Sequence, residues 1–546
     1  MPLALQVHDI ENLPMDHSAL RDLPVDPELR NFRRQAHGAL LSKVQPTPVA
    51  APQLIGWSRE VAALLDLPAV PQSADSYAQC LSGNRLTPAM QPFASRYGGH
   101  QFGHWAGQLG DGRAITLGET VNRLGQRWEL QLKGAGPTPY SRGADGRAVL
   151  RSSIREFLCS EAMFHLGVPT TRALSLVLTG DRVLRDMFYD GRAELEPGAI
   201  VCRVAPSFFR IGHLQLPAAH GETEVLQALL RHVLTRHYPH LLSAPLLPGT
   251  AVQPEVLLAF FEELCRSSAS LVVHWQRVGF VHGVMNTDNT SLLGLTIDYG
   301  PYGWLENYDP DWTPNTTDAH GRRYCFGQQP QVMLWNLAQL GQVLRGAGCD
   351  APALQACLQT YADVFETELA AMNLARLGLQ PTQEGLALVD DQWPLLQAVE
   401  TDMLLWFRGL ADLPAVSEQR HGLTASDREL EAAVEQAFYS PADLQGPHRV
   451  ALLDWLRRYQ LELQRLAVAD AARRLAMNQL NPLVVPRNWL VQQAIDAAQA
   501  GDFAAIDRLL EAFRQPYAVP ADPSLYGRRP EWARQRAGCS MLSCSS

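Results

Sequence analysis

Lys133, Glu156, Asn289 and Asp298 are residues of the types that bind phosphate groups and divalent cations. Only two of the 46 basic residues are lysines, Lys43 and Lys133. Lysine supplies a compact ammonium where the planar guanidinium of arginine would not serve. Asparagine and aspartate offer the oxygen ligands that Mg²⁺ prefers. A lysine held by a glutamate, together with two oxygen ligands for Mg²⁺, predicts a triphosphate site.

A glycine-dense segment, residues 97–113, ends in the turn Gly110-Asp111-Gly112-Arg113. Glycines allow backbone amides to approach phosphates closely, although they also simply make tight turns. A Walker A loop is excluded because Gly134 follows Lys133 and no GxxxxGK[ST] motif exists. A Rossmann loop is excluded because the segment does not join a strand to a crossover helix.

The order of these residues along the chain favours a kinase-like arrangement. A glycine loop, Lys133 at a strand end, Glu156 on a helix, His282 seven residues before Asn289, and Asp298-Tyr-Gly follow one another. Protein kinases have a glycine loop, a strand lysine, a helix glutamate, HRDxxxxN and DFG in the same order. The match predicts a nucleotide bound through Lys133 and through a metal ion at Asn289 and Asp298.

One position departs from the kinase pattern. Two residues after the histidine, where kinases have the catalytic aspartate, this chain has Val284, which cannot accept a proton. Asp288, beside the predicted metal ligand, is the nearest replacement carboxylate. Its alternative role is to cap the loop.

Two arginines, Arg203 and Arg210, lie in the apolar stretch VCRVAPSFFRIGH. An unpaired buried cation is costly, so each needs an anionic partner. Phosphate groups would satisfy both, and so would internal aspartates or glutamates.

The hydrophobic pattern predicts the elements that position these residues. Period-two alternation predicts that Lys133 ends a strand on its polar face. The expected strands are residues 113–119, 127–133, 173–178, 200–205 and 292–297, and the expected helices are residues 58–67, 147–166 and 254–278. Beyond them, most of the chain to about residue 515 is predicted to be helical.

Composition limits the class of protein. The chain has 546 residues, 46% of them hydrophobic, with 12 tryptophans, which excludes extensive disorder. A net charge of −10 argues against general nucleic-acid binding. No apolar stretch reaches the ~20 residues of a membrane span. Nine scattered cysteines suit a reducing cytoplasm, where we expect the protein to reside.

The motifs taken together resemble the selenoprotein O family, protein adenylyltransferases on a kinase-like fold. The resemblance covers most of the chain and rests on YGGHQFGHWAGQLGDGR, LQLKGAGPTPYSR, VCRVAPSFFRIG, VHGVMNTDN, TIDYGPYG and the terminal SCSS. It implies that ATP binds inverted relative to kinases, so that AMP is transferred to a protein hydroxyl. An inverted nucleotide would also explain Val284, because a displaced phosphorus needs a different base.

The resemblance implies a role for each matching residue. Asp288 would accept the proton, Glu156 would pair with Lys133, and Asn289 and Asp298 would bind Mg²⁺ or Mn²⁺. The nucleotide would be held by Gly110, Gly112, Arg113, Lys133, Asp145, Gly146, Arg203, Arg210 and Asp298.

The C-terminal cysteines are a further point of resemblance. Cys544 stands where some members of the family carry selenocysteine. Some relatives also have a cysteine soon after Asp-Tyr-Gly, but here that stretch has Pro314 and no thiol. A regulatory disulfide would need Cys325 or the pair Cys539 and Cys544, and a reduced tail is the alternative.

We therefore expect an α+β, protein-kinase-like two-lobed fold with terminal extensions and a mostly helical C-lobe. The predicted parts are an N-terminal extension (1–95), an N-lobe (96–215), a helical C-lobe with the metal site (216–520) and a flexible cysteine-containing tail (521–546). The expected reaction transfers AMP from ATP to serine, threonine or tyrosine hydroxyls of protein substrates, with Mg²⁺ or Mn²⁺, and involves no nucleic acid or membrane. The alternatives are a kinase-like phosphotransferase and an inactive nucleotide-binding pseudokinase scaffold. The sequence leaves open the protein substrates, any use of UTP with Mn²⁺, and the oligomeric state.

Overall fold

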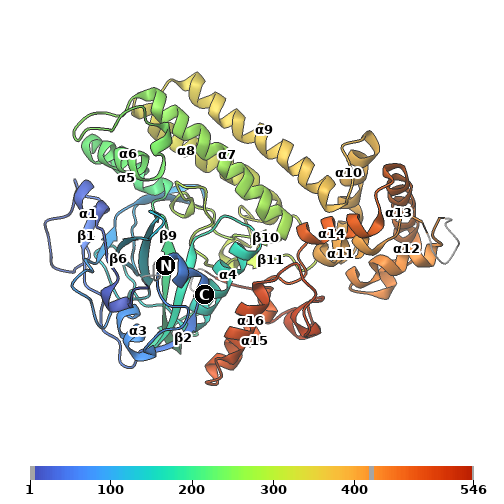
Figure 1. Cartoon of the computed structure of the whole chain (residues 1–546), viewed down its shortest axis with the longest axis horizontal. Helices are drawn as coiled ribbons and strands as arrows, with labels where there is room; N and C mark the ends of the chain where they lie inside the picture. Colours follow the sequence, from blue (N-terminus) through green and yellow to red (C-terminus); the bar gives the residue numbers. More distant parts are fainter. Residues whose placement is uncertain (1–6, 417–423, 544–546) are drawn as a thin grey trace, which may run out of the picture.

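A computed structural model describes residues 7–416 and 424–543 of the chain. These residues form a mixed α/β structure, with a seven-stranded sheet in the N-terminal half and a mainly helical C-terminal half (Figure 1). Among them, every helix is too short or too polar to cross a membrane.

The main sheet is antiparallel throughout and has the order β1-β3-β6-β7-β9-β8-β2. Two small ribbons pair β4 with β5 and β10 with β11. The strands are β1 (Leu41–Lys43), β2 (Gln53–Trp57), β3 (Phe93–Ser95), β4 (Gly98–Gln101), β5 (His104–Gln108), β6 (Ala114–Val121), β7 (Arg127–Lys133), β8 (Arg172–Arg185), β9 (Glu194–Ala205), β10 (Phe280–Val281) and β11 (Gly303–Trp304).

Strand β7 has one apolar and one polar face, as its sequence predicts. Leu130 and Leu132 pack into a core cluster with Trp128 at its edge. Glu129, Gln131 and Lys133 alternate with them and therefore point to the opposite face. This polar row leads along the strand to the candidate site.

Glu129, in this row, predicts a pH-dependent stability. Burial, reinforced by the charge of Glu119 opposite on β6, raises the pKa of Glu129 to about 8. The native state keeps this proton up to about pH 8, whereas an unfolded glutamate releases it near 4.5. Stability is thus lost as pH rises between these values, by on the order of 4 kcal/mol. Glu129→Gln should raise the melting temperature at pH 8.5 far more than at pH 5. An equal rise at both pH values, or the same pattern in the exposed control Glu194→Gln, would contradict this account.

Helix α4 (Leu150–His165) packs against β8 and β9 on one side and against α15 and α16 on another. A helix that packs on one side only would bury a single apolar stripe. Instead nearly the whole helix is buried, because it has neighbours on both sides. The helix ends before Gly167, which adopts a left-handed φ of +73°. Glu156 is therefore buried, and its charge needs a partner.

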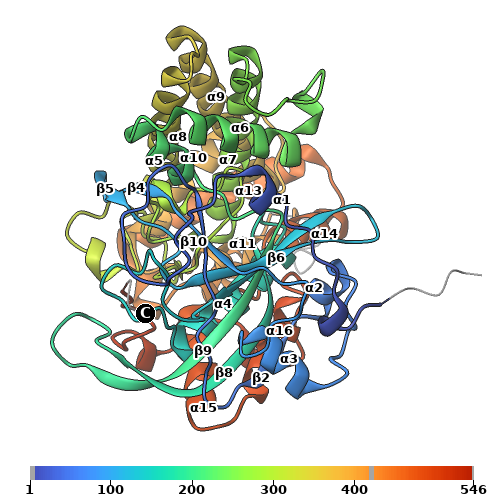
Figure 2. The same cartoon turned by 90° about the vertical axis from the view of Figure 1, so that its left-hand side faces the viewer.

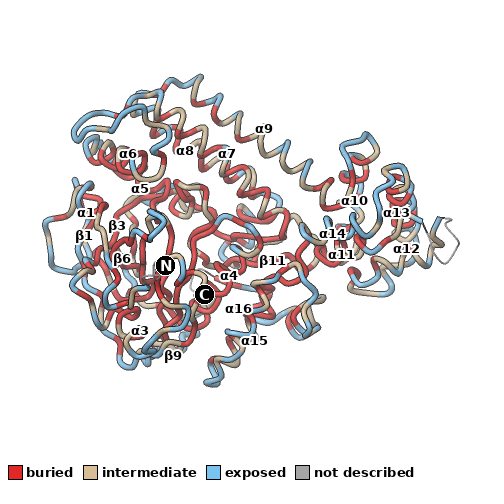
Figure 3. The backbone as a smooth tube through the Cα atoms, viewed as in Figure 1, coloured by how far each residue is buried: buried red, intermediate tan, exposed pale blue. Residues whose placement is uncertain are grey.

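The C-terminal half is built around the long helix α7, which begins at Pro254 and ends before Gly279, as predicted. Buried residues are frequent in the sheet, α4 and α7, whereas most of α9 is intermediate or exposed (Figure 3). Besides α4, the α-helices of the described residues are α1 (Ser18–Asp22), α2 (Arg59–Leu64), α3 (Ala74–Leu81), α5 (Ile211–Ala219), α6 (Thr223–His237), α7 (Pro254–Val278), α8 (Gln329–Gly346), α9 (Ala351–Arg376), α10 (Gln383–Ala398), α11 (Met403–Asp412), α12 (Asp427–Val434), α13 (Gly446–Leu466), α14 (Asp470–Leu480), α15 (Asn488–Gln499) and α16 (Ala504–Phe513).

The predicted strand at residues 292–297 is wrong. This segment turns at Gly294, which has a φ of +63°, and makes only isolated bridges, Ser291 with Arg210 and Thr296 with Thr170. A left-handed residue in the middle of a six-residue segment prevents a continuous ladder. Asp298 therefore follows a loop that is tied to its neighbours at both ends.

The two ends of the chain are more integrated than the sequence suggested. The segment before residue 96 contributes β1, β2 and β3 to the main sheet, so residues 41–43, 53–57 and 93–95 share a layer with the strands that follow. Leu542 near the C-terminus donates to Pro314 O and accepts from Thr316 N. Residues 521–543 thus pack on the body instead of forming a loose tail, while Cys544 lies outside the described residues.

Candidate functional site

The site begins with Lys133 at the end of β7. Its Nζ lies 2.8 Å from Glu156 Oε2 and 2.9 Å from Asp298 Oδ1. The Lys133 side chain is 10% exposed and that of Glu156 is 4% exposed. The three residues come from β7, α4 and the loop after residue 297, so the ion pairs join three separate segments.

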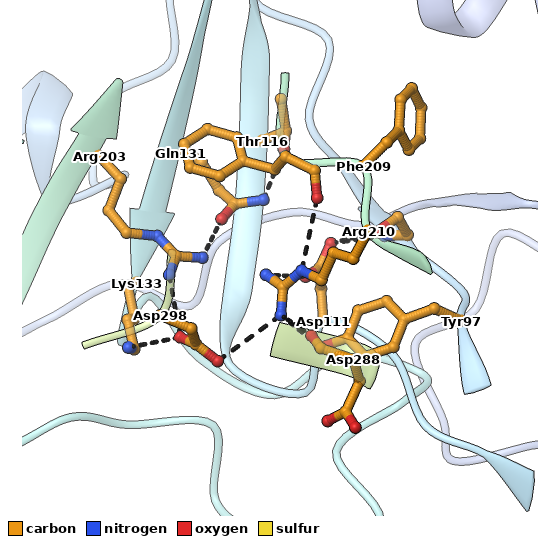
Figure 4. Close-up of polar contacts among 12 residues, drawn as sticks. Tyr97, Asp111, Thr116, Gln131, Lys133, Arg203, Phe209, Arg210, Asp288 and Asp298 are labelled. Atoms are coloured by element: carbon orange, nitrogen blue, oxygen red, sulfur yellow. Dashed lines mark hydrogen bonds and ion pairs between the residues drawn. The ribbon is translucent and has the colours of Figure 1, made fainter. Parts of the chain in front are cut away.

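The two arginines converge on the same carboxylate (Figure 4). Arg203 Nη1 lies 3.1 Å from Asp298 Oδ1 and 3.3 Å from Glu156 Oε1, and Arg210 Nη1 lies 3.5 Å from Asp298 Oδ2. Gln131, which pairs with Arg203 across β7 and β9, accepts a further hydrogen bond from that guanidinium. Internal acids thus supply partners for both arginines, but three cations share the Asp298 carboxylate.

Asp298 has an unusual electrostatic and backbone environment. Burial alone would raise the pKa of Asp298, but Lys133, Arg210 and Arg203 hold it well below its usual range. The residue also adopts a left-handed φ of +65°, which is uncommon outside glycine and clusters at functional sites. Asp298 is therefore ionised, with its side chain 28% exposed toward the cavity described below.

Asp288 and Asn289 lie in a short 3₁₀ helix, Thr287–Asn289. Arg210 Nη1 donates to the backbone oxygen of Asp288 at 3.0 Å, while the Asp288 carboxylate points away from that guanidinium (Figure 4). Burial raises the pKa of Asp288 to about 6. One carboxylate oxygen, Oδ1, is buried and has no hydrogen-bond partner among the described residues. A carboxylate of this kind can accept a proton.

A cavity of about 780 Å³ brings the predicted residues together. Glu156 does not line it and acts only through its contacts with Lys133 and Arg203. The predicted site residues that do line it are Gly110, Gly112, Arg113, Lys133, Asp145, Gly146, Arg203, Arg210, Asp288, Asn289 and Asp298.

Two of these residues have structural reasons for their type. Gly110 has a φ of +142°, and a Cβ there would lie 2.7 Å from Tyr140 Cγ, so this turn needs glycine with or without a ligand. Asp145 forms a two-pronged ion pair with Arg185, both at 2.8 Å, which ties the loop before α4 to β8. The carboxylate of Asp145 is thus already occupied at the cavity wall.

Sequence reasoning missed the contribution of β4. Gln101 Nε2 donates to Asp288 Oδ2 at 3.2 Å, and His100 N donates to Thr287 Oγ1 at 2.7 Å. A Cβ on Gly99 would lie 2.8 Å from Asp288 Cβ and 2.9 Å from its Cγ. The glycines and polar residues of the 97–113 segment were a visible signal, but only the fold shows that part of that segment holds Asp288.

Gly99→Ala should consequently displace the Asp288 side chain. The new methyl group would collide with a buried carboxylate that the neighbouring backbone confines. With Asp288 in its predicted role of proton acceptor, we expect the rate of AMP transfer to fall at least about 10-fold, since small displacements of a reacting group are costly. ATP affinity, measured by calorimetry, should change less than twofold. A variant in which ATP affinity and transfer rate fall together would argue that Gly99 serves the nucleotide instead.

The chain has close relatives of named function. Residues 30–514 match the family model of the protein adenylyltransferase SelO. The chain belongs to the SelO family. Proteins named protein nucleotidyltransferase YdiU from Rhodopirellula baltica, Azoarcus sp. and Xanthomonas campestris pv. campestris are 52%, 53% and 53% identical to it over 541, 537 and 538 residues. These alignments cover 98% of this chain and at least 99% of each relative.

Membership of the SelO family confirms the predicted class of enzyme, a nucleotidyltransferase. The resemblance read from the motifs is confirmed as well. The roles of single residues stay predictions, since the comparison concerns the whole chain.

Proposed function

We propose that this SelO-family enzyme transfers AMP from ATP to hydroxyl groups of protein substrates, on a kinase-like two-lobed fold. The observation that carries the proposal is the convergence of Lys133, Arg203 and Arg210 on Asp298 at the wall of the 780 Å³ cavity. Two parts of the molecule support a two-lobed arrangement (Figure 2). The main sheet together with α4 would form one lobe, the helices around α7 would form the other, and residues of both parts line the cavity.

In the proposed reaction, the substrate hydroxyl attacks the α-phosphorus of ATP. The new oxygen–phosphorus bond forms as the bond to the β-phosphate bridge breaks, and pyrophosphate leaves. Lys133, Arg203 and Arg210 offset the phosphate charge, and the Asp288 carboxylate takes the hydroxyl proton. An inverted ATP, with its α-phosphorus toward the acceptor, belongs to the same proposal, because Val284 supplies no base at the kinase position.

Asn289 and Asp298 fit a divalent cation. Both line the cavity, and Asn289 Nδ2 donates to Val284 O at 3.0 Å, which leaves the amide oxygen to act as a ligand. A carboxylate and an amide oxygen are hard donors suited to Mg²⁺ or Mn²⁺. When bound, such an ion supplies positive charge that stabilises the leaving pyrophosphate.

We place the reaction in the cytoplasm. The eight described cysteines are buried free thiols, a state that a reducing compartment maintains.

The test uses ATP labelled at either the α- or the γ-phosphorus, with Mg²⁺ and a mixture of candidate acceptor proteins. We expect α-label on protein, an AMP mass increment and release of pyrophosphate. Transfer of γ-label with a phosphate increment would make the protein a phosphotransferase, and absence of both labels with intact ATP binding would make it a scaffold.

A further inference from the structure

A second cavity, of about 730 Å³, lies beside the site, between the segment 311–328 and helix α8. Arg322, Arg323 and Asp311 are the charged residues that line it, and Trp335 of α8 forms part of its wall. Two cations against one anion give the lining a net positive charge. Nothing in the proposed transfer step uses this cavity.

Arg323 is the central cation of this cavity. Its guanidinium carbon lies 4.7 Å from the centre of the Trp335 ring and 5.8 Å from that of Tyr324. Within residues 7–416 and 424–543, no carboxylate lies within 4.0 Å of the guanidinium of Arg322 or Arg323, and the buried Nε–H of Arg323 has no acceptor. Asp318 is close in sequence, but its oxygens accept from the backbone amides of Arg323 and Tyr324, at 3.0 and 2.7 Å. A guanidinium held on aromatic rings without an anion is ready for one from outside.

The β4–β5 hairpin joins this cavity to the Asp288 carboxylate. Gln101 donates to Asp288, and Phe102 N donates to the Tyr324 hydroxyl at 2.9 Å. His100 packs edge-on against Trp335, with ring centres 5.4 Å apart. The same Tyr324 hydroxyl donates to Asn286, which lines the nucleotide cavity, at 2.6 Å. The β4–β5 hairpin and Tyr324 thus contact residues that line both cavities.

We propose that this second cavity binds an acidic segment of the acceptor protein, with an aspartate or glutamate side chain on Arg323 and Arg322 while a neighbouring hydroxyl faces Asp288. The inference rests on the proposed function, and it specifies the substrate class as proteins whose acceptor hydroxyl is flanked by acidic residues. Charge complementarity favours this occupant over a basic or purely apolar peptide.

The experiment uses three synthetic peptides with one acceptor serine, identical except for three flanking aspartates, asparagines or lysines. Their affinity is measured by fluorescence anisotropy with ATP absent, and their AMP transfer with Mg²⁺ and ATP. The aspartate peptide should bind at least about 10-fold more tightly than the asparagine peptide, the size expected for one charge-assisted contact. Arg323→Ala should reduce that preference to about twofold or less, whereas Arg345→Ala, at the exposed end of α8, should leave it unchanged.

Arg322→Glu provides a variant whose folding is not in question, because this side chain is exposed. It should shift the preference toward the lysine peptide.

Equal binding of the three peptides, or a preference for the aspartate peptide that survives Arg323→Ala, overturns the inference. Tighter binding of inorganic phosphate or nucleotide than of the aspartate peptide at Arg323 also overturns it. Preferential binding of the aspartate peptide without AMP transfer would refute the proposed function and leave the inferred peptide site standing. AMP transfer without a preference for the aspartate peptide would refute the peptide site and leave the proposed function standing.

Discussion

Lys133→Ala should lower AMP transfer by about 10²–10³-fold, the cost of removing one preorganised charge from a reaction centre. The Lys133 ammonium lies 2.8 Å from Glu156 and 2.9 Å from Asp298. Without this positive charge, the two carboxylates would repel the bound phosphate groups. Lys133→Arg should not restore the rate, because a planar guanidinium does not fit a 10% exposed position between two carboxylates. The measurement is incorporation of α-labelled AMP into an acceptor protein.

The chain supplies its own control for this variant. Lys43, exposed at the end of β1, is the other lysine of the chain, and Lys43→Ala should transfer AMP at the wild-type rate. With two lysines, amine acylation followed by peptide mass mapping reports on each one separately. ATP with Mg²⁺ should protect Lys133 and not Lys43. Equal modification of Lys133 with and without nucleotide would remove it from the phosphate site.

The parts of the fold that the sequence predicted correctly are those that local chemistry determines. Helix α7 runs from Pro254 to Val278, because proline favours the first helical turn and Gly279 permits the left-handed cap. The alternation along β7 placed Lys133 on the polar face, where the structure has it. Both signals lie within a few residues of the feature that they predict.

The remainder depends on contacts between distant segments. The Gln101 contact to Asp288 joins residues 187 positions apart, and no local pattern encodes that distance. The predicted strand before Asp298 failed for a related reason: an apolar run does not reveal that Gly294 turns back on Ser267. The apolar pattern likewise does not reveal how much of α4 is buried. Helices α15 and α16, more than 300 residues later in the chain, cover the side of α4 that does not face the sheet.

The order of the motifs predicted the glycine loop, Lys133, Glu156, Asn289 and Asp298, and the family resemblance implied the other site residues. The structure brings all of them except Glu156 to the wall of one cavity. What the order could not show is the network among them. Asp298 is shared by Lys133, Arg203 and Arg210, so the arginines are paired internally and still face the cavity. Internal pairing and phosphate binding, which appeared as alternatives from the sequence, are compatible in the structure.

Asp288→Asn should lower AMP transfer by about 10²–10⁴-fold, the usual contribution of a general base. The amide keeps the shape of the side chain but cannot accept the hydroxyl proton. Because burial raises the pKa of Asp288 to about 6, the wild-type rate should climb with pH up to about 6 and then level off as the carboxylate ionises. Rates measured from pH 5 to 8 at saturating ATP and Mg²⁺ test this profile, and ATP affinity should survive the substitution. A residual rate in Asp288→Asn with the wild-type pH profile would assign the base to another group.

Gln101→Leu separates the base from the residue that positions it. The Gln101 amide stabilises the ionised form of Asp288 through its 3.2 Å hydrogen bond, so its removal should raise the pKa of Asp288 further. The rising limb of the rate profile should then move to higher pH, while the plateau rate falls less than in Asp288→Asn. A purely structural role for Gln101 would lower the rate equally at every pH. A displaced limb ties the titrating group to the carboxylate that Gln101 contacts, because no other ionisable side chain in the described part of the chain hydrogen-bonds to the Gln101 amide.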